Sequence, residues 1–170
     1  GYVQSMAIGL VVEDTSGIQS FTMEDDYTKL EISKLDMTSR EEISGAELTL
    51  YEAYRVYDDT DRGWHLEILL DTAGEPVITA NWVSAGNTPH WIDHIMPGDY
   101  ILRETRVPTK AGYVTSEDVE VIIEETGEVQ SFVMEDDHTA IEFYKVDSVT
   151  EEVLPSENPA TLALYPALLD

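Results

Sequence analysis

Three segments of the chain each carry two apolar residues and then an ionisable one at alternate positions. The rows are Leu30-Ile32-Lys34, Tyr100-Leu102-Glu104 and Phe132-Met134-Asp136. Because successive side chains of a β-strand point to opposite faces, one amine and two carboxyl groups share the apolar faces and point toward the core. An uncompensated charge in a core costs several kcal/mol. The alternation therefore indicates either a buried ionic cluster of the three groups or strand ends that reach solvent.

The elements that position these groups are predicted to be short β-strands. Two further rows with the same period are Ala46-Leu48-Leu50 and Val119-Val121-Ile123. Turn residues separate the strands, at Pro97-Gly98 and at a hairpin expected near Thr126-Gly127. No stretch shows a helical period. We predict an all-β fold, a Greek-key sandwich of two sheets with an Ig-like arrangement.

The chain repeats part of itself. Residues 1–36 recur as residues 112–147, with 17 of 36 positions identical at a constant offset of 111. The segment ELTLYEA at 47–53 recurs as TLALYPA at 161–167, three residues later than this offset requires. A fixed period of this size is typical of tandem modules rather than of an enzyme with one unique site.

The repeat predicts the domain organisation. Residues 1–27 are expected to be the C-terminal part of a preceding repeat, 28–137 a complete module, and 138–170 the N-terminal part of a following repeat. The complete module has the usual size of a single domain. The two partial repeats are too short to form cores of their own.

The composition excludes several classes of partner and cofactor. The chain has 35 acidic and 9 basic residues and a net charge of −26, which disfavours binding to nucleic acid or to anionic membranes. It lacks an apolar run of about 20 residues, so we expect no membrane insertion in this segment. Because the chain has no cysteine, disulfides and thiolate metal sites are excluded. We expect no cofactor.

Two possible metal sites lie in the long segment 54–95. The acidic residues of one are Asp58, Asp59 and Asp61, but Arg62 and Gly63 interrupt the alternating oxygen ligands of a calcium loop, so a solvated turn is the better interpretation. The spacing of His90 and His94 suits a metal only on a helix, and the residues between them favour a strand. We therefore predict no metal site.

The same segment contains all three tryptophans, Trp64, Trp82 and Trp91. They have two interpretations. They could form an aromatic platform for a glycan or a protein, or they could pack on the sandwich and its edges, which is the commoner role of tryptophan in such folds. We expect any specialised function to lie in this segment.

Several motifs give the chain a resemblance to a known family. They are ISKLD at 32–36, ISGAELTLYEA at 43–53, MPGDYILRETRVP at 96–108, GYV at 112–114 and a closing strand that ends in Asp136. In this order they resemble the Cna B-type (SpaA-like, prealbumin-like) domains of Gram-positive surface proteins and pilins. The resemblance covers the whole module and both partial repeats.

The resemblance implies a spontaneous isopeptide bond. Lys34 would be the nucleophile, Asp136 the acceptor and Glu104 the acid that assists the reaction. The family often has Asn at the acceptor position, and Asp136 changes the lost molecule from ammonia to water. The neighbouring Asp137 stays an alternative, because a slip of one residue would turn it inward. The counterparts Asp25 and Lys145 belong to the partial repeats and are expected to stay unpaired.

The implied chemistry explains these residue types. An ammonium group cannot attack and a carboxylate is a poor electrophile, so both must react in their neutral forms, which an apolar core favours. Glu104 would move protons between the amine and the leaving oxygen. Fixing the two groups in contact supplies effective molarities of about 10⁵ to 10⁸ M.

The expected function is that of a structural stalk or spacer module in a repetitive, extracellular bacterial surface protein, attached to the cell wall through other parts of the parent chain. Its expected partners are neighbouring repeats, and its only reaction is one autocatalytic cross-link. The alternative is an adhesin module that binds a host extracellular protein or glycan through residues 54–95.

Overall fold

The computed structural model describes residues 1–60, 62–108, 112–154 and 163. Within these ranges the chain forms ten β-strands. The described residues contain no helix that is long and apolar enough to cross a membrane. The chain divides into two compact units, Gly1–Thr139 and Ala140–Asp170.

The smaller sheet of the first unit joins the first and last strands of the predicted module. Its order is β10 (Val129–Asp136), β3 (Lys29–Asp36) and β7 (His90–Asp93). Strand β10 runs parallel to β3 over its whole length, with Met134 beside Lys34. Strand β7 pairs antiparallel with the other edge of β3.

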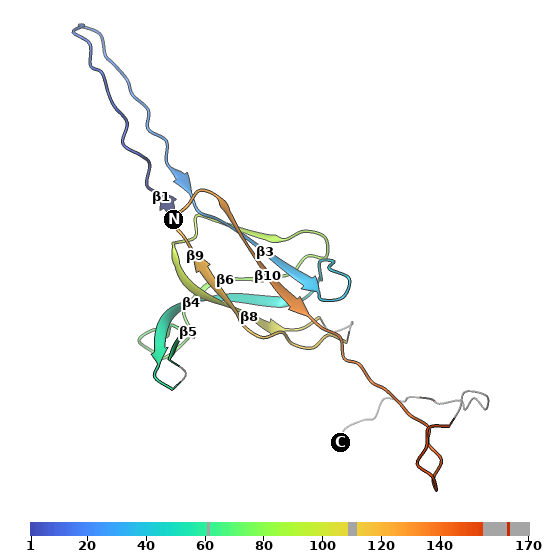
Figure 1. Ribbon diagram of the computed structural model, residues 1–170. Coiled ribbons are helices and arrows are strands. Elements are labelled where there is room, and N and C mark those ends of the chain that lie inside the picture. The colour runs from blue at the N-terminus through green and yellow to red at the C-terminus, as the bar shows by residue number, and fades with distance from the viewer. Residues whose placement is uncertain (61, 109–111, 155–162, 164–170) are drawn as a thin grey trace. The chain divides into compact units, whose positions relative to one another are not determined.

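The larger sheet is built around β4 (Glu47–Asp58). Its first half lies between β6 (Ile78–Val83) and β8 (Gly98–Arg106), and β9 (Val119–Ile123) continues the sheet beyond β8. The second half of β4 pairs with β5 (Gly63–Ile68) in a hairpin at one end of the sheet (Figure 1). Strands β3, β7 and β10 of the smaller sheet alternate along the chain with strands of the larger sheet. The chain therefore crosses repeatedly between the two sheets.

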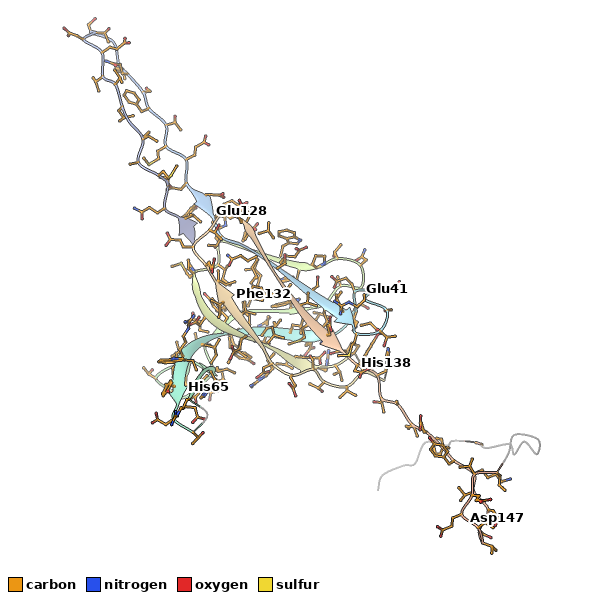
Figure 2. The ribbon with its side chains drawn as sticks, in the orientation of Figure 1. Glu41, His65, Glu128, Phe132, His138 and Asp147 are labelled. Atoms are coloured by element: carbon orange, nitrogen blue, oxygen red, sulfur yellow. The ribbon has the colours of Figure 1, made fainter. Side chains whose placement is uncertain are left out.

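The predicted apolar rows meet between the two sheets. The smaller sheet contributes Leu30, Ile32 and Met134 to the core, with Phe132 packed against it (Figure 2). The larger sheet and its approaches contribute Leu48, Leu50, Ile95, Tyr100, Leu102, Val121 and Ile123. Strand β3 buries every second residue, as a half-buried strand requires, whereas β4 and β8 each bury three successive residues. The prediction of an all-β, two-sheet sandwich with Greek-key crossovers is confirmed.

The prediction of a hairpin near Thr126-Gly127 is wrong. Strand β9 pairs with β8 in the larger sheet, whereas β10 pairs with β3 in the smaller sheet. The turn at 126–127 therefore carries the chain from one sheet to the other. A period of two identifies the buried face of each strand but not its partner, because both strands of a sandwich turn their apolar faces to the same core.

The turn that follows β3 is repeated in the second unit. Asp36 Oδ1 accepts hydrogen bonds from two backbone amides, and Asp147 Oδ1 does the same at the equivalent positions. Arg40 and Glu151 have φ values of 63° and 58°. The bridges that close the two turns are Leu35–Glu42 and Val146–Val153. The sequence repeat is therefore accompanied by the same local backbone structure.

Asp36 also ties the end of β3 to residues that follow the other strands. Its Oδ2 accepts hydrogen bonds from the Tyr113 hydroxyl at 2.9 Å and from His138 Nε2 at 2.7 Å. His138 follows the end of β10 (Figure 2). The backbone hydrogen bond from Ser39, and next the Tyr113 hydroxyl, hold the pKa of Asp36 well below its ordinary value.

We expect Asp36→Asn to destabilise the module at neutral pH and to reduce its sensitivity to acid. The folded-state pKa of Asp36 lies below the unfolded value of about 3.9, so the stabilisation is fully present above that pH and is lost as the pH falls toward the folded value. Urea unfolding at about pH 7 and about pH 2.5 measures this difference. The matched control is Asp59→Asn, at an exposed aspartate. A gap between wild type and Asp36→Asn that does not narrow in acid would contradict the assignment.

Candidate functional site

The structure brings Lys34, Glu104 and Asp136 together between the two sheets. Their exposed fractions are 1%, 4% and 0%. They come from β3, β8 and β10, so the larger sheet contributes Glu104 and the smaller sheet the other two. Lys34 Nζ donates a hydrogen bond to Asp136 Oδ1 and lies 3.4 Å from Glu104 Oε1. The interpretation of these positions as strand ends in solvent is therefore wrong, because all three groups are buried and adjacent.

Of the two neighbouring carboxylates, Asp136 faces the core. Asp137 is exposed, and its Oδ1 accepts a hydrogen bond from the backbone amide of His138 at 2.7 Å. This difference follows from the pleat of β10, in which successive side chains point to opposite faces, and Asp137 directly follows that strand.

Ser116 joins the cluster, and the sequence analysis did not identify it. Lys34 Nζ donates to Ser116 Oγ at 2.9 Å, and the backbone amide of Ser116 donates to Glu104 Oε2 at 3.1 Å. Ser116 lies between β8 and β9, outside any strand, so no periodicity places it. The available signal was the repeat itself, because Ser5 is identical at the equivalent position.

The electrostatics of the cluster favour a neutral acid at Glu104. Burial raises the pKa of Glu104, and the hydrogen bond from the Ser116 amide partly opposes this effect. Glu104 Oε1 and Asp136 Oδ2 are buried without a hydrogen-bond partner among the described residues. An unsatisfied buried oxygen costs about 1 to 3 kcal/mol. Burial of these oxygens without a donor disfavours the charged carboxylate and favours the protonated acid.

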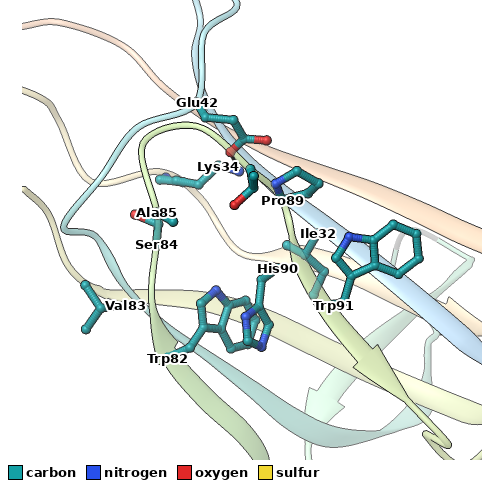
Figure 3. Close-up of a pocket in the computed structure, with 11 residues that line it drawn as sticks. Ile32, Lys34, Glu42, Trp82, Val83, Ser84, Ala85, Pro89, His90 and Trp91 are labelled. Atoms are coloured by element: carbon teal, nitrogen blue, oxygen red, sulfur yellow. Dashed lines mark hydrogen bonds between the residues drawn. The ribbon is translucent and has the colours of Figure 1, made fainter.

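Lys34 also lines a pocket of about 140 Å³. In Figure 3, Trp82 and His90 lie near one end of it, and Lys34 and Glu42 near the other. The rings of Trp82 and His90 are stacked, with centroids 4.3 Å apart. Burial lowers the pKa of His90.

The three tryptophans belong to different surroundings. Trp82 packs against the core, and Trp91 lines the same pocket. Trp64 lies on the β4–β5 hairpin, with its ring edge-on to Tyr57 at 5.2 Å. Packing on the sandwich therefore accounts for Trp82, and Trp64 is left as an exposed aromatic residue.

The described residues contain no group of three or more His, Cys, Asp or Glu side chains placed to hold a metal. Asp58 Oδ1 accepts hydrogen bonds from the amide and the hydroxyl of Thr60, as in a turn. Asp61, the third acidic residue of the segment, lies outside the described residues. His90 is in strand β7, and His94 follows that strand.

The two counterparts in the partial repeats are exposed. Asp25 precedes β2 (Asp26–Tyr27), in the loop that leads from β1 (Tyr2–Val3). Lys145 lies in the second unit, where its backbone carbonyl accepts a hydrogen bond from Leu154.

Comparisons with known proteins agree with this description. The family model "SpaA: Prealbumin-like fold domain" matches residues 28–138. The comparison with curated proteins found no match.

Pilins are among the similar solved structures. The major pilin subunit BcpA of Bacillus cereus is 21% identical with a TM-score of 0.46, over 67% of this chain and 31% of the pilin. A streptococcal ancillary pilin is 18% identical with a TM-score of 0.47, over 75% and 38%. The C-terminal domain of the shaft pilin of Lactobacillus rhamnosus GG is 13% identical with a TM-score of 0.44, over 66% and 98%.

This chain spans less than half the length of the first two of these pilins. The family match covers well over half of the chain and coincides with the sandwich that carries the buried cluster. The chain belongs to the family of SpaA-type domains with a prealbumin-like fold.

Proposed function

We propose that residues 28–137 are a structural stalk module stapled by an isopeptide bond between Lys34 and Asp136. The observation that carries the proposal is the buried contact of the Lys34 amine with the Asp136 carboxyl group beside Glu104. Membership of the SpaA-type family supports it.

The reaction forms one amide bond and releases one water molecule. Transfer of a proton from the ammonium to the carboxylate, which are in contact, gives the neutral amine and the neutral acid. Nζ then bonds to Cγ of Asp136, and the Cγ–Oδ1 bond breaks. Glu104 gives a second proton to Oδ1, which leaves as water, and takes one proton from the attacking nitrogen, so it ends in its starting state. Oδ2 remains as the oxygen of the amide. Ser116 orients both Nζ and the Glu104 carboxyl group.

The position of the bond suits a protein that resists pulling. Strands β3 and β10 are parallel neighbours, and Lys34 and Asp136 lie toward the C-terminal ends of both. Force that enters at the start of β3 and leaves after β10 would pass directly through the bond. Residues 35–135 would then carry no load.

The organisation of the parent protein follows from the repeat. We propose that residues 1–27 end a preceding module and 138–170 begin a following one, and the repeated turn after Asp36 and Asp147 supports this division. Neighbouring repeats are then the partners of the module. The parent protein would be extracellular and attached to the cell wall through segments outside this chain, and the module would turn over no substrate.

Peptide mapping of the protease-digested protein tests the proposal. We expect one branched peptide in which the Lys34 side chain is joined to Asp136. A branch at Asp137 would contradict the assignment of the acceptor, and unmodified peptides for both strands would contradict the bond itself.

We expect Asp136→Asn to form the same covalent product as the wild type. The amide loses ammonia where the acid loses water, so the two cross-linked proteins have identical masses. Asp136→Ala has no acyl carbon to attack and should keep its full calculated mass. The matched control is Asp137→Asn, which should still lose one water. Intact mass spectrometry measures all four proteins, and a cross-link that survives in Asp136→Ala would show that another residue is the acceptor.

The β4–β5 hairpin supports a second candidate function, that of an adhesin. Trp64 is 68% exposed, and Tyr54 and Tyr57 on the same hairpin are each 45% exposed. Exposed aromatic rings of this kind bind sugar faces and protein surfaces. Screening on a glycan array with the wild type, Trp64→Ala and the control Trp91→Ala tests this candidate. Binding that is lost only in Trp64→Ala would support it, and no binding by any of the three would oppose it.

A further inference from the structure

The segment His94–Pro97, between β7 and β8, packs against residues 1–27, the proposed end of the preceding repeat. The His94 ring stacks on Tyr27 with centroids 4.1 Å apart and planes within 9°. Tyr2 meets the same ring edge-on at 5.2 Å. Both tyrosines belong to residues 1–27, so His94 lies on the boundary between two repeats.

Backbone contacts fix this boundary. Thr28 is fully buried, and its hydroxyl donates to the carbonyl of Ile95 while its amide donates to the carbonyl of Gly1 at 3.2 Å. The His94 amide donates to the carbonyl of Thr28 at 2.9 Å. Gly1 packs so closely that a Cβ there would lie 2.7 Å from the Ile95 carbonyl oxygen and 2.9 Å from Pro97 Cδ.

The same arrangement exists at the other end of the module. At the offset of 111, the counterparts of Gly1, Tyr2, Tyr27 and Thr28 are Gly112, Tyr113, His138 and Thr139. The bridge between Tyr2 and Tyr27 is repeated between Tyr113 and His138. The Thr139 amide donates to the Gly112 carbonyl at 2.8 Å, as the Thr28 amide does to Gly1.

The two ends differ in what covers them. Thr28 is buried, whereas Thr139 is exposed. A Cβ on Gly112 would meet no described atom within 4 Å, in contrast to the close packing at Gly1. The His138 ring is already held in place, since it stacks on Tyr113 at 4.5 Å and bonds to Asp36.

We propose that Gly112, Tyr113, His138 and Thr139 form a junction face that docks the His94–Pro97 segment of the following copy of this module. The occupant is a second copy because the other end of the same chain shows that segment seated on the equivalent residues. His138 supplies a flat ring where Tyr27 does, so the stack with His94 is preserved. The contact fixes the orientation of successive modules. This inference rests on the tandem arrangement of the proposed function but not on the isopeptide bond.

The native chain provides the first test. Amide hydrogen exchange measured by NMR should become about tenfold faster at Thr28 in His94→Ala than in the wild type, because the segment that covers Thr28 loses its stack on Tyr27. Exchange in the core strands should not change. The matched control is His65→Ala, at a histidine on the exposed β4–β5 hairpin. Unchanged exchange at Thr28 in His94→Ala would overturn the role of His94.

The second test is a chain in which residues 28–138 occur twice in succession within the full sequence. In this chain the second copy of Thr28 directly follows the first copy of His138, where the native chain has Thr139. We expect amide exchange at this threonine to be about tenfold slower than at Thr139 of the native chain, because the following module buries it as Thr28 is buried. His94→Ala in the second copy alone should restore fast exchange. Equal exchange in the two chains would overturn the docking proposal. Intact mass, measured on the same samples, reports the cross-link separately, so failure of one proposal is distinguishable from failure of the other.

Discussion

Replacing Lys34 with methionine is expected to lower the free energy of unfolding by about 4 to 5 kcal/mol, the value for a cross-link that closes a loop of about 100 residues. Lys34 and Asp136 are 102 residues apart in the sequence. Without the bond the unfolded chain gains the entropy that this loop removes. Methionine has a similar length to lysine and leaves no buried ammonium group, but the Asp136 and Glu104 carboxyl groups lose their buried partner, and this adds to the loss.

Unfolding in guanidinium chloride measures this change through the midpoint of the transition and through the m-value. The midpoint should fall, and the m-value should rise, because the unfolded Lys34→Met chain exposes more surface than a chain that is still closed into a loop. The matched control is Lys145→Met, at an exposed lysine in the second unit, and it should behave as the wild type. Equal midpoints and m-values for Lys34→Met and the wild type would show that Lys34 contributes no cross-link.

Replacing Glu104 with glutamine is expected to slow formation of the bond by about 10² to 10⁴-fold, the usual contribution of a positioned general acid or base. Glutamine keeps the size of the side chain and can still accept the hydrogen bond from the Ser116 amide. It cannot give up and regain a proton, so the leaving oxygen must obtain its proton from elsewhere. The folded but unreacted protein should therefore accumulate.

The time course of intact mass after expression measures this rate. The wild type should be fully cross-linked when first isolated, and Glu104→Gln should change slowly or not at all. The matched control is Glu117→Gln, at an exposed glutamate beside Ser116, which should react as the wild type does. If the Glu104→Gln protein is fully cross-linked on isolation, the proposed role of Glu104 in proton transfer is contradicted.

The sequence allowed the buried faces of the sandwich to be predicted, because a period of two is a local property. The rows that end in Lys34, Glu104 and Asp136 are buried in the structure as the alternation indicated, except that Phe132 is only partly buried. Partners were not predictable in the same way. The parallel pairing of β3 with β10 and the crossing turn at 126–127 depend on contacts between distant segments.

Ser116 illustrates why the site could be predicted only in part. It reaches Lys34 and Glu104 from a segment without regular structure, where neither a period nor a turn signal applies. The junction shows the same limit in another form. Thr28 and Thr139 are identical and equivalent in the repeat, yet one is buried and the other exposed. Only the three-dimensional contacts of His94–Pro97 distinguish them.

The most direct measurement is the intact mass of the purified wild-type protein under denaturing conditions, beside that of Lys34→Met. We predict a wild-type mass lower than the calculated value by one water molecule, and the full calculated mass for the variant. A wild-type protein with its full calculated mass would contradict the proposed staple, and Lys34, Glu104 and Asp136 would then form only a buried ionic cluster.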